Sequence, residues 1–361
     1  MTTIDLHIIR RFLVGILYLT LSLIIFFVVL HYVEYIDDFF DRGATMKDVF
    51  LVYYLNYLPE IVKLTSPLAV FLSSVYLTGK LSQKLQIAAL QTSGVSLYRI
   101  MVPFLLVGIL VSGFMFWFNG WVVPVTNQKV IEFEQRFLKG NQVQIDLHDV
   151  HRQSTPGSVI TVGYYDRFSK VANKVSIQDY EESQRLILRL DADRMVWVDS
   201  TERWRLEGVT ERHFGKNGWP AQREIDYLDT TLTVFPRDFA RTQREVESMT
   251  VPDAREYIDS LLRSGANSTG RTQVAYFNKF AYPLANLIVV LIAVPLASVR
   301  RRGGQAIQMG IGLLVSFFYL ATIKLVEPFG YEETLSPAMA AWLPHALFLI
   351  LGIFLLIRAK K

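Results

Sequence analysis

The sequence predicts a helical membrane protein with six transmembrane helices and an all-β, jellyroll-like domain inserted between the third helix and the fourth. Two observations lead to this fold class. Of the 361 residues, 51% are hydrophobic and only 19% are charged, whereas soluble domains carry roughly 25% charged residues. The apolar residues also fall in long blocks toward both ends of the chain, while the middle third is polar.

Six stretches are long and apolar enough to cross a membrane. A helix that crosses ~30 Å of hydrocarbon needs about 20 apolar residues, and each span must be helical because lipid offers no partner to a bare backbone amide. The expected spans are Phe12–Val33, Val49–Leu77, Met101–Val123, Phe277–Val299, Ala306–Leu325 and Ala338–Ile357. The first span is too long for the core of a cleavable signal peptide, so we expect it to be retained.

The charges of the connections alternate in sign. Basic residues flank the first span, the second-to-third and fourth-to-fifth connections and the end of the chain: Arg10, Arg11, Lys80, Lys84, Arg99, Arg300, Arg301, Arg302, Arg358, Lys360 and Lys361. Acidic residues occupy the intervening short loops: Glu34, Asp37, Asp38, Asp41, Asp48, Glu327, Glu332 and Glu333. Because basic loops stay in the cytoplasm, we expect both termini inside and residues 124–272 in the periplasm of a bacterial inner-membrane protein.

The polar middle of the chain consists of short runs of strand-forming residues, separated by turn-forming residues. The runs are Ser158–Gly163, Lys174–Asp179, Arg185–Leu190, Met195–Val198, Arg203–Leu206 and Thr230–Phe235, and the turns include Pro156-Gly157, Asp199-Ser200 and Lys216-Asn217-Gly218. This pattern predicts an antiparallel sheet or jellyroll of about eight or more strands.

A helix and a linker are expected to return the chain to the membrane. Val251–Leu262 has the pattern of an amphipathic helix, with Pro252 at its start and Gly265 beyond its end, and Ser264–Arg271 forms the linker. The expected domains are therefore residues 1–123, 124–272 and 273–361.

One cluster in the inserted domain has metal-ligating residue types. Asp146, His148, Asp149 and His151 lie close together in the sequence. They are interpreted as a solvated loop at the domain entry, with a metal site as the alternative. The chain holds neither the zinc-protease H-E-x-x-H pattern nor the G-x-S-x-G turn of hydrolases. It has no cysteine, which excludes disulfides, zinc thiolates and a cysteine nucleophile.

The chain also lacks the phosphate-binding loop of ATPases. Gly79-Lys80 is followed by Leu81, where that loop has Ser or Thr. Any work that the protein does must therefore draw energy from a partner or an ion gradient. The loop between the second and third spans, about residues 80–98, contains an apolar, helix-permissive segment, Leu81–Leu90, which ends at a C-cap, Ser93-Gly94. This segment is either a short helix that docks on another protein or an ordinary connecting loop.

A few charged or polar side chains fall inside the spans, where each costs roughly 2.5–3.5 kcal/mol at the bilayer centre. Glu60 and Lys63 are three residues apart, share a helix face and are expected to pair. We interpret them as a polar lining for an amphiphilic or anionic substrate, with snorkelling of end residues to the interface as the alternative. For Lys279 and Lys324, near the outer ends of their spans, snorkelling to the interface is preferred. His31 lies at the outer end of the first span.

Several short motifs have the spacing of a known family. They are Leu58-Pro59-Glu60 and Ser66-Pro67-Leu68-Ala69 in the second span, Leu90-Gln91-Thr92-Ser93-Gly94 in the following loop, Gly120-Trp121-Val122-Val123-Pro124, Tyr257–Gly265, and Val294-Pro295-Leu296 before the arginine cluster. Together with the layout of the spans, they make nearly the whole chain resemble the LptF/LptG (YjgP/YjgQ) permease family of lipopolysaccharide export, and within it the G-type subunit.

The resemblance implies a non-catalytic permease subunit of an ABC-type transporter. Such a subunit extracts lipopolysaccharide from the inner membrane and passes it to a periplasmic bridge. The implied partners are a cytoplasmic LptB-like ATPase dimer that uses the ATP, a homologous LptF-like permease and LptC/LptA-like jellyroll proteins; no cofactor in this chain and no nucleic acid are implied.

The resemblance also implies two sets of site residues. Coupling to the ATPase is assigned to Leu81, Leu85, Gln86, Ala89, Leu90 and Gly94, and the lipid cavity to His31, Glu60, Lys63, Phe317 and Lys324. Two positions depart from the family: Gln86 stands where Glu is common, and His31, followed by acidic residues, stands where basic residues meet lipid phosphates.

Two other function classes remain. A membrane-anchored structural protein could present the β domain as an assembly platform, and it predicts neither an ATPase partner nor a bound lipid. An intramembrane enzyme would need a pair of aspartates or a Ser/His constellation within the spans, and the sequence has neither.

Overall fold

The chain forms two compact units in the computed structural model. The model describes residues 3–41, 43–137, 148–155, 157–166, 169–181, 185–198, 201, 203–215, 221–232, 234, 236, 243–263, 269–299 and 304–359. The first unit, here the membrane unit, comprises Met1–Leu138, Val246–Pro252 and Gly270–Lys361. The second, the β unit, comprises Lys139–Glu245 and Asp253–Thr269.

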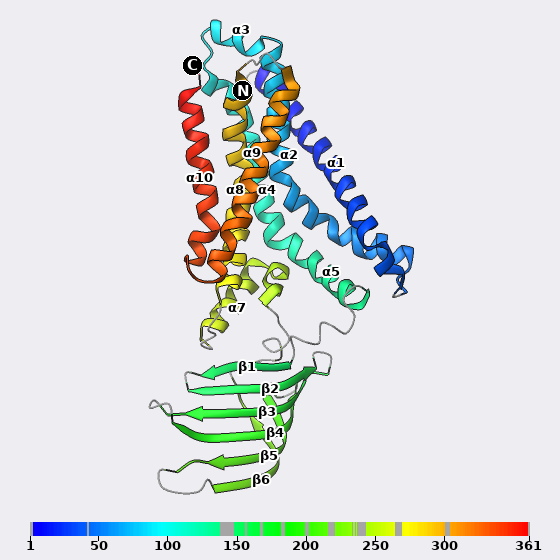
Figure 1. The fold of residues 1–361 in the computed structure, drawn as a ribbon, viewed down its shortest axis with the longest axis vertical. Helices are drawn as coiled ribbons and strands as arrows, with labels where there is room; N and C mark the ends of the chain where they lie inside the picture. The colour runs from blue at the N-terminus through cyan, green and yellow to red at the C-terminus, as the bar shows by residue number, and fades with distance from the viewer. Residues whose placement is uncertain are drawn as a thin grey trace. The chain divides into compact units, whose positions relative to one another are not determined.

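The membrane unit is helical throughout (Figure 1). Its helices are α1 (Thr3–Asp41), the π-helix η1 (Asp48–Tyr54), α2 (Leu55–Gln83), α3 (Gln86–Thr92), α4 (Leu97–Trp117), the π-helix η2 (Phe118–Val122), α5 (Val123–Phe137), α8 (Gly270–Ser298), α9 (Gly304–Tyr331) and α10 (Pro337–Arg358). In the described part of the chain, six helical segments are long and apolar enough to cross a membrane. The six spans predicted from the sequence are thereby confirmed.

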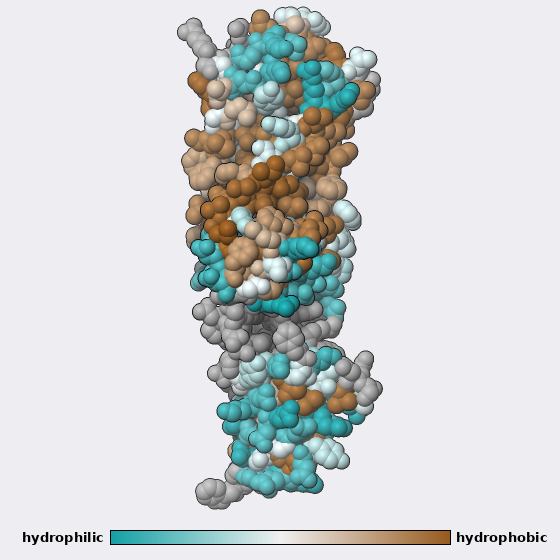
Figure 2. Space-filling view, turned by 90° about the vertical axis from the view of Figure 1, so that its right-hand side faces the viewer, coloured by the Kyte–Doolittle hydropathy of each residue, from teal (hydrophilic) through white to brown (hydrophobic). Residues whose placement is uncertain are grey.

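Helices α2 and α8 form the centre of the membrane unit. Helix α2 packs on α1, α8 and α9, and α8 also packs on α4 and α10. Their buried residues, such as Val70, Phe71 and Val289, form one apolar core with Phe12 and Phe104 from α1 and α4. The outward faces of the other helices are apolar as well. In Figure 2 hydrophobic side chains cover the middle of this unit and polar ones gather at both of its ends, as a lipid-facing surface requires.

One end of the membrane unit holds both ends of the described chain together with helix α3. The first and last described turns of the chain and helix α3 lie at one end, called here the terminal end (Figure 1). At this end, the Arg99 guanidinium donates to both carboxylate oxygens of Asp5, at 2.8 and 2.7 Å, and ties α4 to α1. The predicted basic residues Arg300, Arg301, Arg302, Lys360 and Lys361 lie outside the described residues.

The connection toward the inserted domain is longer than expected. The third span continues through η2 into α5, and α5 packs against η1 and α2. Residues up to Leu138 therefore belong to the membrane unit, although the sequence placed the boundary at residue 124. The reason is that Val130 and Phe133 of α5 are apolar and pack against the tyrosines of η1.

The β unit is built on one antiparallel sheet, which is curved (Figure 1). Its strands are β1 (His148–Thr155), β2 (Ser158–Asp166), β3 (Val171–Tyr180), β4 (Leu186–Val198), β5 (Arg203–His213) and β6 (Ala221–Thr230), in the order β1-β2-β3-β4-β5-β6. The described residues thus form six strands, where the sequence predicted eight or more. Neighbours in the sheet are neighbours in the sequence, so the described sheet is a meander.

One face of the sheet carries the core of the β unit. Alternate residues such as Ile160 and Val162 in β2, or Val175 and Ile177 in β3, are buried in one cluster. The Trp204 indole at the centre of this cluster donates from Nε1 to the Val234 carbonyl, at 2.7 Å. Strand β6 ends at Thr230, so the strand predicted for Thr230–Phe235 is wrong at residues 231, 232 and 234; residues 233 and 235 lie outside the described residues. Leu232 and Val234 instead pack against the core of the β unit.

Two short helices follow the sheet in the chain. The 3-10 helix η4 (Gln243–Ser248) precedes helix α7 (Val251–Arg263), which confirms the amphipathic helix predicted for Val251–Leu262. The turns predicted at Asp199-Ser200 and Lys216-Asn217-Gly218, the Pro156 half of the first turn, and the stretch 264–268 of the linker lie outside the described residues.

Candidate functional site

The first group of polar residues in the membrane unit centres on Glu60 of α2. The Lys63 Nζ donates to Glu60 Oε1 at 2.8 Å, which confirms the pair predicted from the spacing. The other carboxylate oxygen, Oε2, accepts from the Asn127 amide of α5 at 3.1 Å. Each carboxylate oxygen of Glu60 therefore accepts a hydrogen bond from a protein side chain, and the bond from Asn127 links α2 to α5. Asn127 was not singled out in the sequence, because it lies beyond the predicted end of the third span.

Lys279 of α8 belongs to the same region. It is only 4% exposed, and its Nζ donates to the backbone carbonyl of Glu247 at 3.3 Å. The Lys63 ammonium repels the Lys279 ammonium, and the Glu60 carboxylate attracts it. The prediction that Lys279 snorkels to the interface is therefore wrong, because α8 lies at the centre of the unit and has no lipid-facing side at this position.

A second polar group surrounds Glu327 of α9, which is 6% exposed. Its carboxylate accepts from Lys324 Nζ at 2.9 Å, from Asn278 Nδ2 at 2.9 Å and from Tyr331 Oη at 3.2 Å. The sequence assigned Glu327 to an exposed acidic loop, but α9 continues to Tyr331 and carries the residue inside. Lys324 is exposed over 68% of its side chain, so its stem lies at the surface while its ammonium reaches the buried carboxylate.

His31 lies in an aromatic cluster formed by α1, η1 and α2. Its ring stacks on Tyr35, with centroids 4.5 Å apart, and lies 5.0 Å from Tyr57. Its two nitrogens lie 3.1 Å from Tyr54 Oη and 3.4 Å from Tyr53 Oη. His31 is thus enclosed by tyrosines. The signal that could have predicted this cluster is the recurrence of tyrosine at residues 53, 54 and 57, on one side of the second span.

The five residues assigned to a lipid cavity therefore lie in three places. His31 is in the aromatic cluster, and Glu60 and Lys63 form the pair on α2. Phe317 and Lys324 are two turns apart on α9 and share a face; the Phe317 ring is 67% exposed. An amphiphilic molecule that lies along α9 would meet an aromatic ring first and an ammonium two turns further on.

Helix α3 carries most of the residues assigned to coupling. It begins after Leu85, whose φ of 59° lies in the left-handed region, and ends in a double C-terminal cap. Gly94, with a φ of 85°, donates its N–H to the Gln91 carbonyl at 3.0 Å, and Val95 donates to the Leu90 carbonyl at 2.9 Å. The predicted cap is confirmed.

Only one face of α3 is covered. Ile87 is buried and anchors the helix, Leu90 is half-buried, and Leu85, Gln86 and Ala89 are exposed. The sequence analysis did not assign Ile87 or Thr92 to coupling; Thr92 lies beside Ala89 on the exposed face. Leu81 lies on α2 and packs against the membrane core, so it is not on this helix. The break between the helices falls at Lys84-Leu85, four residues later than the sequence indicated.

The described part of the β unit carries ion pairs between neighbouring strands. Arg205 donates to both carboxylate oxygens of Asp229, at 2.8 and 3.0 Å, and holds the pKa of that carboxyl below its usual range. Asp191 of β4 accepts from Arg212 of β5 and also from Arg189 of its own strand. We interpret these pairs as structural. Of the sequence cluster around His148 and His151, Asp146 lies outside the described residues, as do the other side chains; the backbone of His148–Thr155 forms β1.

The chain is similar to known proteins over nearly its whole length. The family model for "Lipopolysaccharide export system permease LptF/LptG" matches residues 6–358. The lipopolysaccharide export system permease protein LptG of Escherichia coli (strain K12) is 20% identical over 346 residues, which cover 90% of this chain and 91% of that protein. LptG of Haemophilus influenzae is 18% identical over 332 residues, 91% of each chain. With its six spans and inserted β sheet, the chain belongs to the LptF/LptG family of lipopolysaccharide export permeases.

Proposed function

We propose that this protein is the G-type membrane subunit of an ABC-type transporter, which extracts lipopolysaccharide from the inner membrane and passes it to a periplasmic jellyroll bridge. Membership of the export permease family over residues 6–358 is the observation that carries the proposal. In this arrangement a partner ATPase dimer, LptB-like, supplies the energy. A homologous LptF-like permease completes the membrane part, and LptC/LptA-like proteins receive the lipid.

Helix α3 is the proposed docking element for the ATPase. It is held rigidly by its C-terminal cap and by Ile87, while Leu85, Gln86 and Ala89 face outward. A rigid helix that is anchored to α2 can transmit a push from the ATPase directly into the centre of the membrane unit. Gln86 is neutral, so we expect docking to depend on shape and apolar contact rather than on an ion pair at this position.

Helices α1 and α9 are the proposed walls of the lipid path. Both pack on α2, and both present large apolar side chains outward, among them Leu17, Leu21, Leu314 and Phe317. Acyl chains would lie against these faces, and Lys324 would meet an acidic group of the headgroup. Transport then needs two conformations with different affinity for the lipid, and ATP binding in the partner would switch between them.

The docking proposal is tested by placing a charge on the exposed face of α3. In Ala89→Asp, the carboxylate would be buried against the ATPase without a partner, so we expect the ATPase no longer to co-purify with the tagged permease. Ala221→Asp, the same substitution at an exposed position of strand β6, is the matched control and should retain the ATPase. Full retention of the ATPase by Ala89→Asp would contradict the assignment of α3.

The cargo proposal needs a separate measurement. Mass spectrometry of the complex purified in detergent should find bound lipopolysaccharide. A complex that contains neither ATPase nor lipid would favour the alternative of a membrane-anchored assembly protein.

A further inference from the structure

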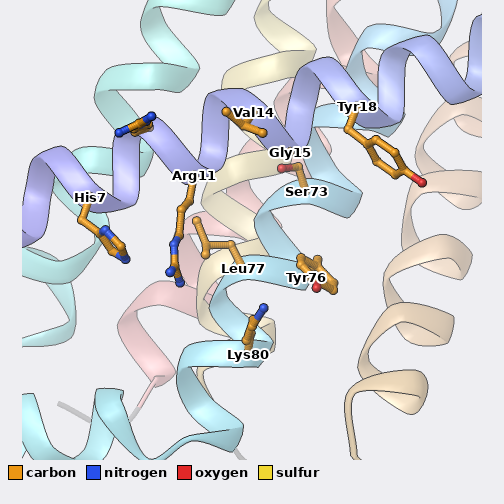
Figure 3. A pocket seen from close by; sticks show the side chains of 10 residues that line it. His7, Arg11, Val14, Gly15, Tyr18, Ser73, Tyr76, Leu77 and Lys80 are labelled. Atoms are coloured by element: carbon orange, nitrogen blue, oxygen red, sulfur yellow. The ribbon is translucent and has the colours of Figure 1, made fainter.

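A cavity of about 500 Å³ opens between α1 and α2 near the terminal end of the membrane unit (Figure 3). Helix α1 lines it with His7, Arg10, Arg11, Val14, Gly15 and Tyr18, and helix α2 with Ser73, Tyr76, Leu77 and Lys80. The two helices run in opposite directions. The first turns of α1 therefore face the last turns of α2, and basic residues from two distant parts of the sequence meet at one mouth.

The lining of this cavity is amphipathic. Three basic side chains, Arg10, Arg11 and Lys80, and the imidazole of His7 lie at one end, and no acidic residue lines the cavity. In Figure 3, Arg11 and Lys80 extend into the same space from the two helices. Val14, Tyr18 and Leu77 make the rest of the lining apolar. From His7 to Tyr18 the α1 face is about 16 Å long, enough for a headgroup and the first part of an acyl chain.

The cations of the cavity differ from Arg99, another basic residue at this end. Arg99 is neutralised by Asp5, which it meets through two hydrogen bonds. Within the described residues, no carboxylate lies within ion-pair distance of Arg10, Arg11 or Lys80; the Lys80 ammonium lies over the Tyr76 ring, 5.6 Å from its centroid. The rule that basic loops stay inside explains their sign. It does not explain their convergence from two helices on one concave, acid-free surface.

We infer that this cavity binds the phosphate of an anionic phospholipid, with one acyl chain along Val14, Tyr18 and Leu77. Basic pockets between transmembrane helices recognise such headgroups through their charge and the adjoining apolar slot. The lipid would bridge α1 to α2, and it would be distinct from the cargo because the site lies at the end opposite the Glu60 and Glu327 groups. Occupancy would then set how far α1, which packs mainly on α2 and α4, can move.

The test uses the full-length protein in detergent and native mass spectrometry with phosphatidylglycerol as the probe. We expect one tightly retained phosphatidylglycerol on the unmodified protein. The double variant Arg11→Gln/Lys80→Gln should bind it about thirtyfold more weakly, since each cation near an anionic lipid contributes a factor of about five. Unchanged thermal midpoints would show that this variant is folded.

The matched control removes the same charge at the same end but outside the cavity. Lys84→Gln/Arg358→Gln replaces two basic residues that do not line the cavity, and it should bind the lipid as the unmodified protein does. Equal weakening in both double variants would overturn the site in favour of general surface attraction. No weakening in either variant would also overturn it, because the cations of the cavity would then have no part in binding.

A competition experiment separates the two possible sources of phosphate. Inorganic phosphate at millimolar concentration should fail to displace the lipid, because it cannot use the apolar part of the cavity. If phosphate displaces phosphatidylglycerol completely, the lipid assignment is wrong and the cavity is a site for a soluble anion.

Discussion

The charged side chains inside the helix bundle of the membrane unit include two groups built on Glu60 and Glu327, and the bonds in these groups limit which of their members can meet a ligand. Glu60 shares its two oxygens between Lys63 and Asn127, and Glu327 accepts from three donors. A carboxylate satisfied in this way cannot release its partners without a large cost. At these positions the polar residues hold helices together, and only the exposed part of Lys324 remains open to a headgroup.

The Glu60 pair allows a prediction in which the double variant is less harmful than the single one. Lys63→Met leaves the Glu60 carboxylate with only the Asn127 amide as a direct partner, so we expect a loss of about 1–3 kcal/mol of stability. In Glu60→Gln/Lys63→Met no charge remains unpaired, and the loss should be smaller. The measurement is the thermal unfolding midpoint of the purified protein in detergent.

The control for this comparison is Lys129→Met, which removes an exposed lysine of α5 and should change the midpoint little. The interpretation fails if the double variant is destabilised by the sum of the effects of the two single variants, Glu60→Gln and Lys63→Met. In that case the two side chains would contribute independently and not as a pair.

At the scale of one element, helix α3 shows how a short helix is made rigid. Seven residues are too few for a stable isolated helix, so α3 depends on the contact of Ile87 and on its C-terminal cap. The cap requires a left-handed residue at Gly94, a conformation that costs an L residue about 1–2 kcal/mol. The conformation of one glycine therefore supports the proposed docking surface.

The corresponding prediction concerns Gly94→Ala. The added Cβ has free space around it but forces an unfavourable φ, so the cap should loosen and the fraction of ATPase retained on the tagged permease should fall severalfold. Gly113→Ala is the matched control: this glycine is also in open space, but it lies inside α4 with an ordinary helical φ. Retention equal to that of the control would show that the cap has no part in docking.

The membrane unit as a whole offers a direct test of its orientation, because the chain has no cysteine. A single cysteine introduced at Ser93, after α3, should be protected from a membrane-impermeant maleimide in cells whose outer membrane has been permeabilised. A single cysteine at Glu332, in the connection between α9 and α10, should be labelled. Both residues are exposed, so accessibility to water does not limit the reaction. The reverse pattern would invert the proposed topology.

The sequence by itself determined the number of spans, the polar and β-rich nature of the insert and the pairing of Glu60 with Lys63. Each of these follows from local features: the length of an apolar run, the alternation of side chains, or a spacing of three residues on one helix. The family motifs were also readable because they are contiguous. The cap at Ser93-Gly94 could be predicted for the same reason.

Only the tertiary structure decided which side chains are inside. Lys279 and Glu327 are buried because α8 lies at the centre and α9 continues past the predicted end of its span. His31 is enclosed because the chain brings residues 53, 54 and 57 back against α1. The basic cavity exists because α1 and α2 are antiparallel and place Lys80 beside Arg11. These are contacts between residues distant in sequence, and a local pattern carries no information about which helices become neighbours.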